Sequence, residues 1–318
     1  MHFTKLLVRS LAVAGIALAA TLPAAAQSTF PSKQVTLVVA FPPGGGADLL
    51  GRLLAKKYEE AWGQSVIVSN RPGAAGTIGA SEVARAPADG HTLLIGASGA
   101  VVPSNEATLA PVSLLSTPPY IVCVNASLPV NTLREFVAYA KAHPDGSVSF
   151  ASSGTASASH LSGELFQGLT QTKLTHVPYK GMGQAVNDLI GGQVTVMFGP
   201  PPALLPHVKS GRLKALAVTD TKRSPLFPEI PTAIEAGVPG LEARAWYGIF
   251  APAGTPPAVI AKINAETSKA LAAPDVVETL ATQGATPAGG DPATFARFLK
   301  ADIAKWDELM RKAGVTTQ

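Results

Sequence analysis

The stretch Val35–Trp62, VTLVVAFPPGGGADLLGRLLAKKYEEAW, combines the features of a buried strand, a glycine-rich turn and a helix. It begins with a β-branched apolar run of the kind buried in parallel sheets. Pro42 and Pro43 end that run because proline cannot donate a ladder hydrogen bond. Leucines then recur at helical spacing, and Gly63 is typical of the residue after a helix. The stretch predicts a strand that turns through glycines into a long helix.

The turn Gly44-Gly45-Gly46 leaves the backbone bare at the predicted helix N-terminus, where the first N–H groups have no helical partners. Such an N-terminus favours a bound anion. The spacing fits neither the dinucleotide motif G-x-G-x-x-G nor a phosphate-binding loop with its lysine. The alternative is a tight structural turn with Asp48 as the N-cap. Taken alone, the stretch leaves both interpretations open.

Residues 1–26 have the pattern of a cleaved export signal. Lys5 and Arg9 precede an apolar run, and Ala24-Ala25-Ala26 matches a small-residue cleavage site. Cleavage after Ala26 leaves 318 − 26 = 292 residues, with 23 basic and 21 acidic side chains and a net charge of 23 − 21 = +2. No apolar stretch is long enough to span a bilayer. We therefore expect a periplasmic protein, and its near-neutral charge argues against nucleic acid as a partner.

Strand-like apolar runs alternate with helical patterns along the chain, which predicts an α/β fold with mostly parallel sheets. The predicted strands are 35–41, 65–69, 92–95, 120–124, 148–151, 174–177, 194–198, 215–218 and 247–251. The predicted helices after the first are 132–141, which opens with a Thr132/Glu135 capping box, and 184–190, 257–271, 274–283 and 292–311. The single cysteine, Cys123, falls within a predicted strand and is expected to be a buried apolar residue.

The length of the chain predicts two domains. Proline-marked segments before Tyr120 and after Val218 suggest that the chain crosses twice between lobes. We expect lobe 1 to comprise residues 27–120 and 221–318 and lobe 2 to comprise residues 121–220, with a hinge near residues 120 and 220.

The carboxyl ends of the predicted strands are rich in glycine and small hydroxyl residues. Ligands bind at this edge of parallel sheets, and such residues offer amide and hydroxyl groups to a compact polar ligand. Tyr179 follows one strand and is equally well explained as a ligand contact or a packing residue. His160 is better explained as a packed histidine, and Lys180 as a solvated lysine. The loop Asn70–Gly76 follows another strand, and its glycines serve either a ligand or the turn itself.

A secreted serine hydrolase is the alternative interpretation. Ser98 lies in Gly96–Ala100, which nearly matches a nucleophile elbow, and Gly44–Gly46 would form its oxyanion hole. An elbow needs a helix directly after the serine, however, and Val101-Val102-Pro103 does not supply one. The histidines are scattered singly and cysteines are not paired, so we expect no metal and no cofactor.

Taken together and in order, the segments of the chain resemble those of the Bug-type solute receptors, the extracytoplasmic receptors of tripartite tricarboxylate transporters. The resemblance covers nearly all of the mature chain in the segments PSKQVTLVVAFPPGGGADLLGRLLA, SNRPGAAGTIGA, ARAPADGHTLLIG, APVSLL, SSGTASASHLSGELF, HVPYKGMGQAVNDLIGGQVTVMF, LPHVKSGRLKALAVTDTKRSPLFPEIPTAIEAG and WYGIFAPAGTP. It implies a two-lobed periplasmic-binding-protein fold, type II-like, with a mostly parallel sheet flanked by helices in each lobe and the ligand in the interlobe cleft.

The resemblance further implies a monomeric receptor without catalytic activity. Such a receptor holds a small carboxylate by backbone amides and hydroxyls and delivers it to the membrane components of a tripartite transporter or to a sensor. The implied ligand-binding residues are Phe41, Pro42, Gly44, Gly45, Gly46, Asp48 and Ser98 in lobe 1, and Ser152, Ser153, Thr155, Ser157, Tyr179, Phe198 and Gly199 in lobe 2.

The chain departs from the family pattern in two places. Many members carry an acidic residue or asparagine where this chain has Gly199-Pro200-Pro201, and an acid there could pair with an amino group. Its absence argues against an amino-acid ligand. The stretch Ala100–Ala110 is shorter than usual, which predicts a more open cleft rim. Aliphatic, aromatic and hydroxylated carboxylates all remain compatible with the sequence.

Overall fold

The computed structural model describes residues 30–282 and 284–313. The chain divides into two compact units, Met1–Ser32 and Lys33–Gln318, and the fold described below belongs to the second. The predicted export signal, residues 1–26, lies outside the described residues.

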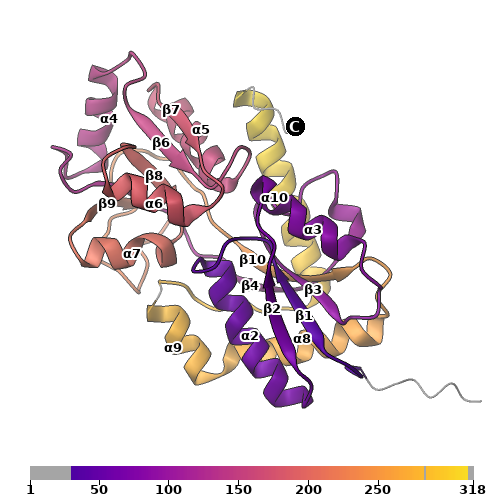
Figure 1. The fold of residues 1–318 in the computed structure, drawn as a ribbon. Helices are drawn as coiled ribbons and strands as arrows, with labels where there is room; N and C mark the ends of the chain where they lie inside the picture. The colour runs from indigo at the N-terminus through magenta and orange to yellow at the C-terminus, as the bar shows by residue number, and fades with distance from the viewer. Residues whose placement is uncertain (1–29, 283, 314–318) are drawn as a thin grey trace, which may run out of the picture. The chain divides into compact units, whose positions relative to one another are not determined.

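The first sheet has five strands in the order β2-β1-β3-β10-β4 (Figure 1). Their bounds are β1 Val35–Val39, β2 Val66–Asn70, β3 Thr92–Ala97, β4 Leu109–Ser116 and β10 Tyr247–Pro252. The strands β1, β2 and β3 run parallel, whereas β10 is antiparallel to β3 and β4.

The second sheet repeats this plan in the order β7-β6-β8-β5-β9. Its strands are β5 Ile121–Asn125, β6 Ser149–Ser152, β7 Thr175–Pro178, β8 Val196–Gly199 and β9 Leu213–Val218. Here β6, β7 and β8 are parallel and β5 is antiparallel to β8 and β9. In each sheet the antiparallel strand is the one the chain forms first after it arrives from the other sheet.

Helices cover both faces of each sheet. The first sheet packs against α2 Gly46–Trp62, α3 Thr77–Ala84, α8 Pro257–Ala272 and α10 Pro292–Ala313. The second packs against α5 Ala158–Thr170, α6 Met182–Ile190 and α7 Pro201–Lys209, and α4 Leu133–Ala142 packs on α5 through Phe136 and Phe166. The short elements are η1 Ala74–Gly76, η2 Glu106–Thr108 and α9 Pro274–Thr282, which packs on α8. Among the described residues, no helix combines the length and the apolar character that crossing a membrane requires.

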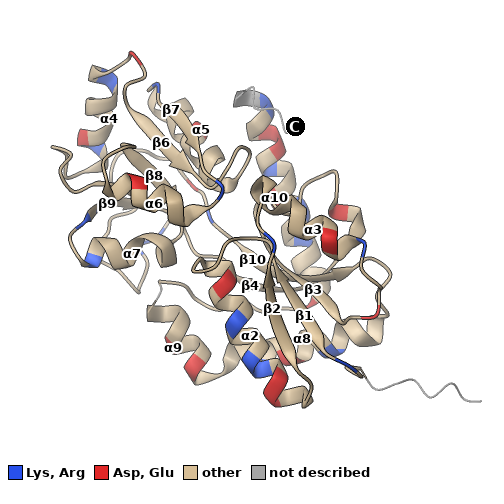
Figure 2. Ribbon diagram, in the orientation of Figure 1, with Lys and Arg blue, Asp and Glu red and all other residues tan. Residues whose placement is uncertain are grey.

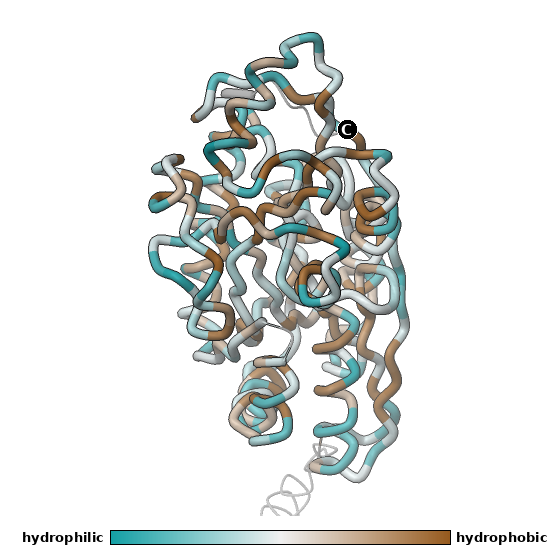
Figure 3. The backbone as a smooth tube through the Cα atoms, turned by 90° about the vertical axis from the view of Figure 1, so that its left-hand side faces the viewer, coloured by the Kyte–Doolittle hydropathy of each residue, from teal (hydrophilic) through white to brown (hydrophobic). Residues whose placement is uncertain are grey.

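The first sheet shows why alternating residues specify its two helical layers. Val39 and Ile95 point to the face covered by α2, where Gly51 allows close approach, while Val38 and Leu94 point to the opposite face with α3 and α10. In Figure 3 the helical segments accordingly change between teal and brown from turn to turn. Figure 2 shows basic and acidic residues interspersed, for example along α2, rather than gathered into one basic surface.

All nine predicted strands are present, as are the predicted helices and the capping box of Thr132 and Glu135. Cys123 is fully buried, and burial raises the pKa of its thiol. The predictions missed β4, because Pro111 interrupts its pattern. This strand lies at the edge of its sheet, where proline is tolerated. They also missed α3, which is short and rich in small residues, α5, and α7, which contains Pro206.

The two connections between the sheets run side by side. The Tyr120 N–H donates to the Ala243 carbonyl, and the Ala245 N–H donates to the Pro118 carbonyl. Between Val218 and Ala243 the chain stays with the second sheet, since Val218 exchanges backbone hydrogen bonds with Pro231 and Ala233. The connections are thus a pair of short extended segments, 118–120 and 243–245.

The helix α10 is fixed to the first sheet by Phe295, which is 1% exposed and packs on Phe250 and against Gly248. Phe295→Ala should lower the free energy of unfolding by about 3–5 kcal/mol, because it removes a buried ring and leaves a cavity. Urea unfolding measures this loss. Lys300→Ala, at an exposed position of the same helix, should change it by less than about 0.5 kcal/mol. Equal losses in both variants would contradict this packing.

Candidate functional site

A cavity of about 640 Å³ lies between the two sheets, on the side where their helices α2, α6 and α7 begin. Its lining comes from six groups of residues. These are Phe41–Ala47 with Pro72 and Gly73, Ala97 with Ser98, Ser153 with Ala158, a stretch from Lys180 to Asn187, a stretch from Pro200 to His207, and Ala245–Tyr247 with Tyr120.

The N-terminus of α2 opens onto the cavity without a side-chain cap. The N-cap residue is Gly45, and the N–H groups of Gly45, Gly46 and Ala47 donate to no acceptor among the described residues. Gly44 has φ +86°, which favours glycine. At Gly46 a Cβ would collide with the Tyr247 hydroxyl, so that hydroxyl lies directly beside the open amides. These amides and the helix dipole make the α2 N-terminus able to hold an anion.

Asp48 holds this loop from beneath. It is the third residue of α2 rather than its N-cap, and its carboxylate accepts hydrogen bonds from the Gly44 N–H (3.0 Å), Arg52 Nε (2.9 Å) and Asn70 Nδ2 (2.9 Å). Burial acts to raise the pKa of Asp48, but these hydrogen bonds and the Arg52 charge hold it below its ordinary value. The Asn70 amide also donates to the Phe41 carbonyl. Asp48 is therefore a support of the glycine loop and does not line the cavity.

Ser98 follows β3 and is one of the residues that line the cavity. Its Oγ is fully buried and has no hydrogen-bond partner within the described residues. A buried orphan hydroxyl costs free energy unless a ligand or water satisfies it. Within the described residues no base is hydrogen-bonded to this hydroxyl, and no helix begins directly after Ser98. A nucleophile elbow is thus absent in this part of the chain.

Three aromatic residues that the sequence did not single out complete this side. Tyr120 comes from one connection, and Trp246 and Tyr247 lie where the other connection enters β10. Burial raises the pKa of both phenols, so each keeps its proton at neutral pH. The Trp246 indole N–H donates to the Asp302 carboxylate of α10 (2.7 Å), which leaves its ring as an apolar part of the wall.

The second sheet contributes another open helix N-terminus. The N-cap of α6 is Gly181, again without a side-chain cap, and the N–H groups of Met182 and Gly183 donate to no acceptor among the described residues. A Cβ on Gly181 would lie 2.7 Å from Pro42 Cγ, so the starts of α2 and α6 approach each other closely. Lys180 lies next to this point and is exposed.

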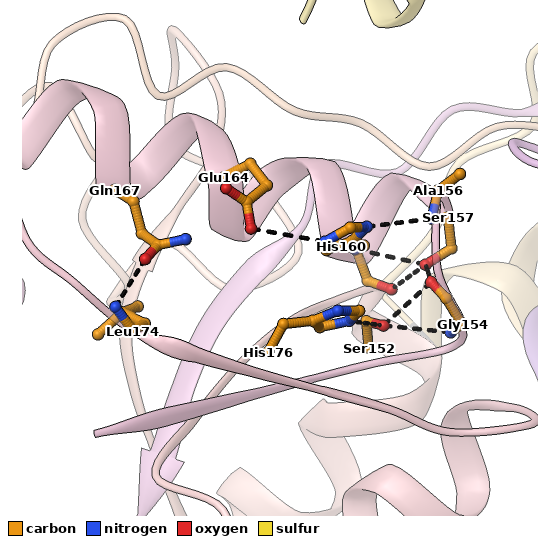
Figure 4. Close-up of polar contacts among 10 residues, drawn as sticks. Ser152, Gly154, Ala156, Ser157, His160, Glu164, Gln167, Leu174 and His176 are labelled. Carbon is orange, nitrogen blue, oxygen red and sulfur yellow. Dashed lines mark hydrogen bonds and ion pairs between the residues drawn. The ribbon is translucent and has the colours of Figure 1, made fainter. Parts of the chain in front are cut away.

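Most residues of the serine-rich loop 152–157 bond within the loop or to the histidines beside it rather than line the cavity; Figure 4 shows these polar contacts. Ser153 lines the cavity. Ser152 and Ser157 are buried, and the hydroxyl of each donates to the Gly154 carbonyl. Thr155 is exposed. Ser157 caps α5 by accepting from the His160 N–H.

Two stacked histidines hold this loop in place. The rings of His160 and His176 lie 3.7 Å apart at 12°. His176 Nε2 bonds Ser152 Oγ (2.6 Å), and His160 Nδ1 accepts from the Ala156 N–H (3.0 Å). Figure 4 shows the two rings bonded to opposite ends of the loop. Burial, followed by the neighbouring His160, lowers the pKa of His176 to about 4.

Half of the predicted site residues reach the cavity. Those that line it are Phe41, Pro42, Gly44, Gly45, Gly46, Ser98 and Ser153; those that do not are Asp48, Ser152, Thr155, Ser157, Tyr179, Phe198 and Gly199. Tyr179 instead donates to Asp188 (2.7 Å), and burial with this bond raises its pKa to about 12. Phe198 packs against the rings of Phe150 and Phe166. Within the described residues, no cluster of three or more His, Cys, Asp or Glu could hold a metal ion.

Removing the Asp48 charge tests its support of the glycine loop. Asp48→Asn should lower the free energy of unfolding by roughly 1–3 kcal/mol at pH 7, because three donors lose a charged acceptor. The folded state depresses the Asp48 pKa, so this contribution is complete above the ordinary value of 3.8 and is lost as the pH falls through the folded value. Urea unfolding at pH 7 and at pH 3 measures the size of the loss and its dependence on pH. The variant Glu59→Gln, at an exposed position of the same helix, is the control. A loss that is the same at both pH values would argue against this role.

The histidine pair predicts an acid-side loss of stability. Between pH 6.5 and about 4 the unfolded chain protonates His176 while the folded protein does not, so the free energy of unfolding falls as the pH falls. His176→Gln keeps a hydrogen-bonding group beside Ser152 and should remove about 1 kcal/mol of this loss at pH 5, allowing for partial exposure. Unfolding curves at pH 7.5 and pH 5, compared with His143→Gln, give the measurement. If the free energy of unfolding of the His176 variant depended on pH as it does in the wild type, His176 would not be the source of the acid-side loss.

Residues 50–315 match the model of the tripartite tricarboxylate transporter family receptor. The chain is 39% identical to protein BugT of Bordetella pertussis over 327 residues, which cover 99% of both chains. Three solved structures are also similar. R. palustris Rpa4515 with adipate has a TM-score of 0.85 and 36% identity, covering 90% of this chain and 99% of that one. The periplasmic binding protein BugD has a TM-score of 0.84 and 33% identity, covering 91% and 100%. MatC from Rhodopseudomonas palustris with bound malate has a TM-score of 0.82 and 34% identity, covering 88% and 99%.

These similarities extend over both sheets and agree with the fold and the segments that the sequence shares with such receptors. They confirm the predicted two-lobed periplasmic-binding-protein architecture. The chain therefore belongs to the family of tripartite tricarboxylate transporter receptors.

Proposed function

We propose that this protein is a periplasmic receptor that binds a small carboxylate in the cavity between its two sheets, without chemical conversion. The observation that carries the proposal is the meeting of two uncapped helix N-termini, at Gly45–Ala47 and at Gly181–Gly183, beside the orphan hydroxyl of Ser98. Free amides at converging positive helix ends favour an anion with oxygen acceptors. The adipate and malate bound by two similar receptors are small carboxylates and support the same class here.

The proposal includes the remaining features expected from the sequence. The protein is exported by residues 1–26 with cleavage after Ala26, acts as a monomer, and passes its ligand to the membrane components of a tripartite transporter or to a sensor. The sequence predicts the lobes as 27–120 with 221–318, and 121–220. Because residues 219–243 stay bonded to the second sheet and Phe227 and Ile230 pack in its core, we place residues 221–243 in lobe 2 and the second crossing at 243–245. The paired connections 118–120 and 243–245 support a hinge between the lobes, because few other segments cross there.

Titration calorimetry against a panel of C4 to C8 carboxylates tests the binding. Titration calorimetry gives the Kd of each carboxylate. In an unfolding measurement, a carboxylate that binds should then raise the free energy of unfolding by about 2.7 kcal/mol at one hundred times its Kd. Binding of a neutral sugar, with no response to any carboxylate, would overturn the proposal.

Ser98→Ala separates a ligand contact from a structural role. Its hydroxyl has no partner in the described residues, so the ligand-free variant should be as stable as the wild type or slightly more stable. Carboxylate affinity should fall about 5- to 20-fold, since a hydrogen bond to a charged group is lost. The matched control is Thr155→Ala, at an exposed position outside the lining, which should bind normally. Unchanged affinity in Ser98→Ala would remove this hydroxyl from the site.

A further inference from the structure

The start of α7 forms a third side of the cavity and differs in chemistry from the starts of α2 and α6. Its N-cap is Pro200, and its first two residues are Pro201 and Pro202. Proline has no N–H group, so these positions offer no donor. Ala203 is the first residue of α7 that has an N–H group, and this group donates to the Pro200 carbonyl (3.1 Å). A helix N-terminus that would otherwise attract an anion is thereby made apolar, and we call Pro200, Pro202 and Ala203 the α7 wall.

The charges around the cavity are equally one-sided. Among the described residues that line it, Lys180 carries the only permanent positive charge and none is acidic. The nearby carboxylate of Asp48 faces away into its own hydrogen bonds. Lys180 precedes the open N-terminus of α6, so the cation and the free amides belong to the same side.

The other polar side chains that line this part of the cavity, the amides of Gln184 and Asn187 in α6 together with His207 and Tyr120, are uncharged. His207 Nδ1 lies 2.7 Å from Arg212 Nη2, and since the guanidinium can only donate, Nδ1 is the acceptor and the imidazole is neutral. Burial, followed by the Arg212 charge, lowers the pKa of His207 accordingly. Tyr120 keeps its phenolic proton. These groups can donate a hydrogen bond but supply no charge opposite a second carboxylate or an ammonium.

We infer that the ligand is a monocarboxylate whose opposite end is apolar and uncharged. This rests on the proposed function, since it assigns the carboxylate to the amides of α2 and α6 and the rest of the ligand to the α7 wall. A second carboxylate there would lose its hydration and gain only neutral donors, without a cation or an uncapped helix N-terminus, and an ammonium would find no acid among the described lining residues. The apolar end instead gains from burial against proline, alanine and aromatic side chains.

Three ligands of equal chain length isolate the far end: hexanoate, adipate and 6-aminohexanoate share the carboxylate and differ only in the terminal group. Titration calorimetry at pH 7.5 should give hexanoate a Kd at least tenfold lower than either of the others, and benzoate a similar advantage over terephthalate. Adipate or 6-aminohexanoate binding as tightly as hexanoate would overturn the inference while leaving the carboxylate receptor intact. A failure of all carboxylates would instead overturn the proposed function.

Ala203→Lys tests the α7 wall directly by placing a cation on it. Ala203 is half-buried within a helix, where lysine is well tolerated. The variant should reverse the order and bind adipate at least tenfold tighter than the wild type does, with weaker binding of hexanoate. Ala203→Gln, which adds a similar length without charge, should leave adipate weak, and circular dichroism should show both variants folded. An Ala203→Lys variant that is folded and keeps the wild-type preference would place the ligand's far end elsewhere and refute the inference.

Discussion

The structure around the cavity depends on keeping a few backbone N–H groups without partners at the start of α2. Three consecutive glycines place no side chain over them, and the helix geometry itself provides no acceptor. Open amides cost free energy in a buried place, so the loop that carries them needs support from elsewhere. Asp48 gives that support, because one carboxylate accepts from Gly44 in the loop, from Asn70 at the end of β2 and from Arg52 one turn along the helix. The open site and its rigid base are thus parts of one hydrogen-bond network.

The second sheet contributes a similar uncapped helix N-terminus from a separate part of the chain. Gly181 starts α6 without a cap, and its lack of a side chain allows Pro42 to approach. Two positive helix ends that approach each other are unfavourable by themselves, and an anion between them offsets the repulsion. The proposed ligand would therefore add a link between the two sheets, which are also joined by the paired segments 118–120 and 243–245 and by packing of α10 on α5. This is the physical basis for expecting closure to accompany binding.

Two further features belong to the second sheet: the histidine pair and the α7 wall. His160 and His176 fix the loop 152–157 from behind, so that Ser153 reaches the cavity while its neighbours are occupied. The prolines that begin α7 remove donors where another receptor of this family could offer them. In the proposed binding mode, the starts of α2 and α6 hold the carboxylate and the start of α7 selects the remainder of the ligand.

The sequence by itself determined the strand–glycine–helix unit, the alternation of strands and helices, the capping box of α4 and the family, because each depends on residues close together in the chain. Only the tertiary structure decided which residues face the cavity. Ser153 lines it and Ser152 does not because neighbouring residues of a strand end point to opposite sides, and Asp48 turns inward because its donors come from β2 and α2. Tyr120, Trp246 and Tyr247 reach the cavity from connections whose pairing is set by segments more than one hundred residues apart. Local sequence patterns carry no information on such pairing, since it results from the packing of whole sheets.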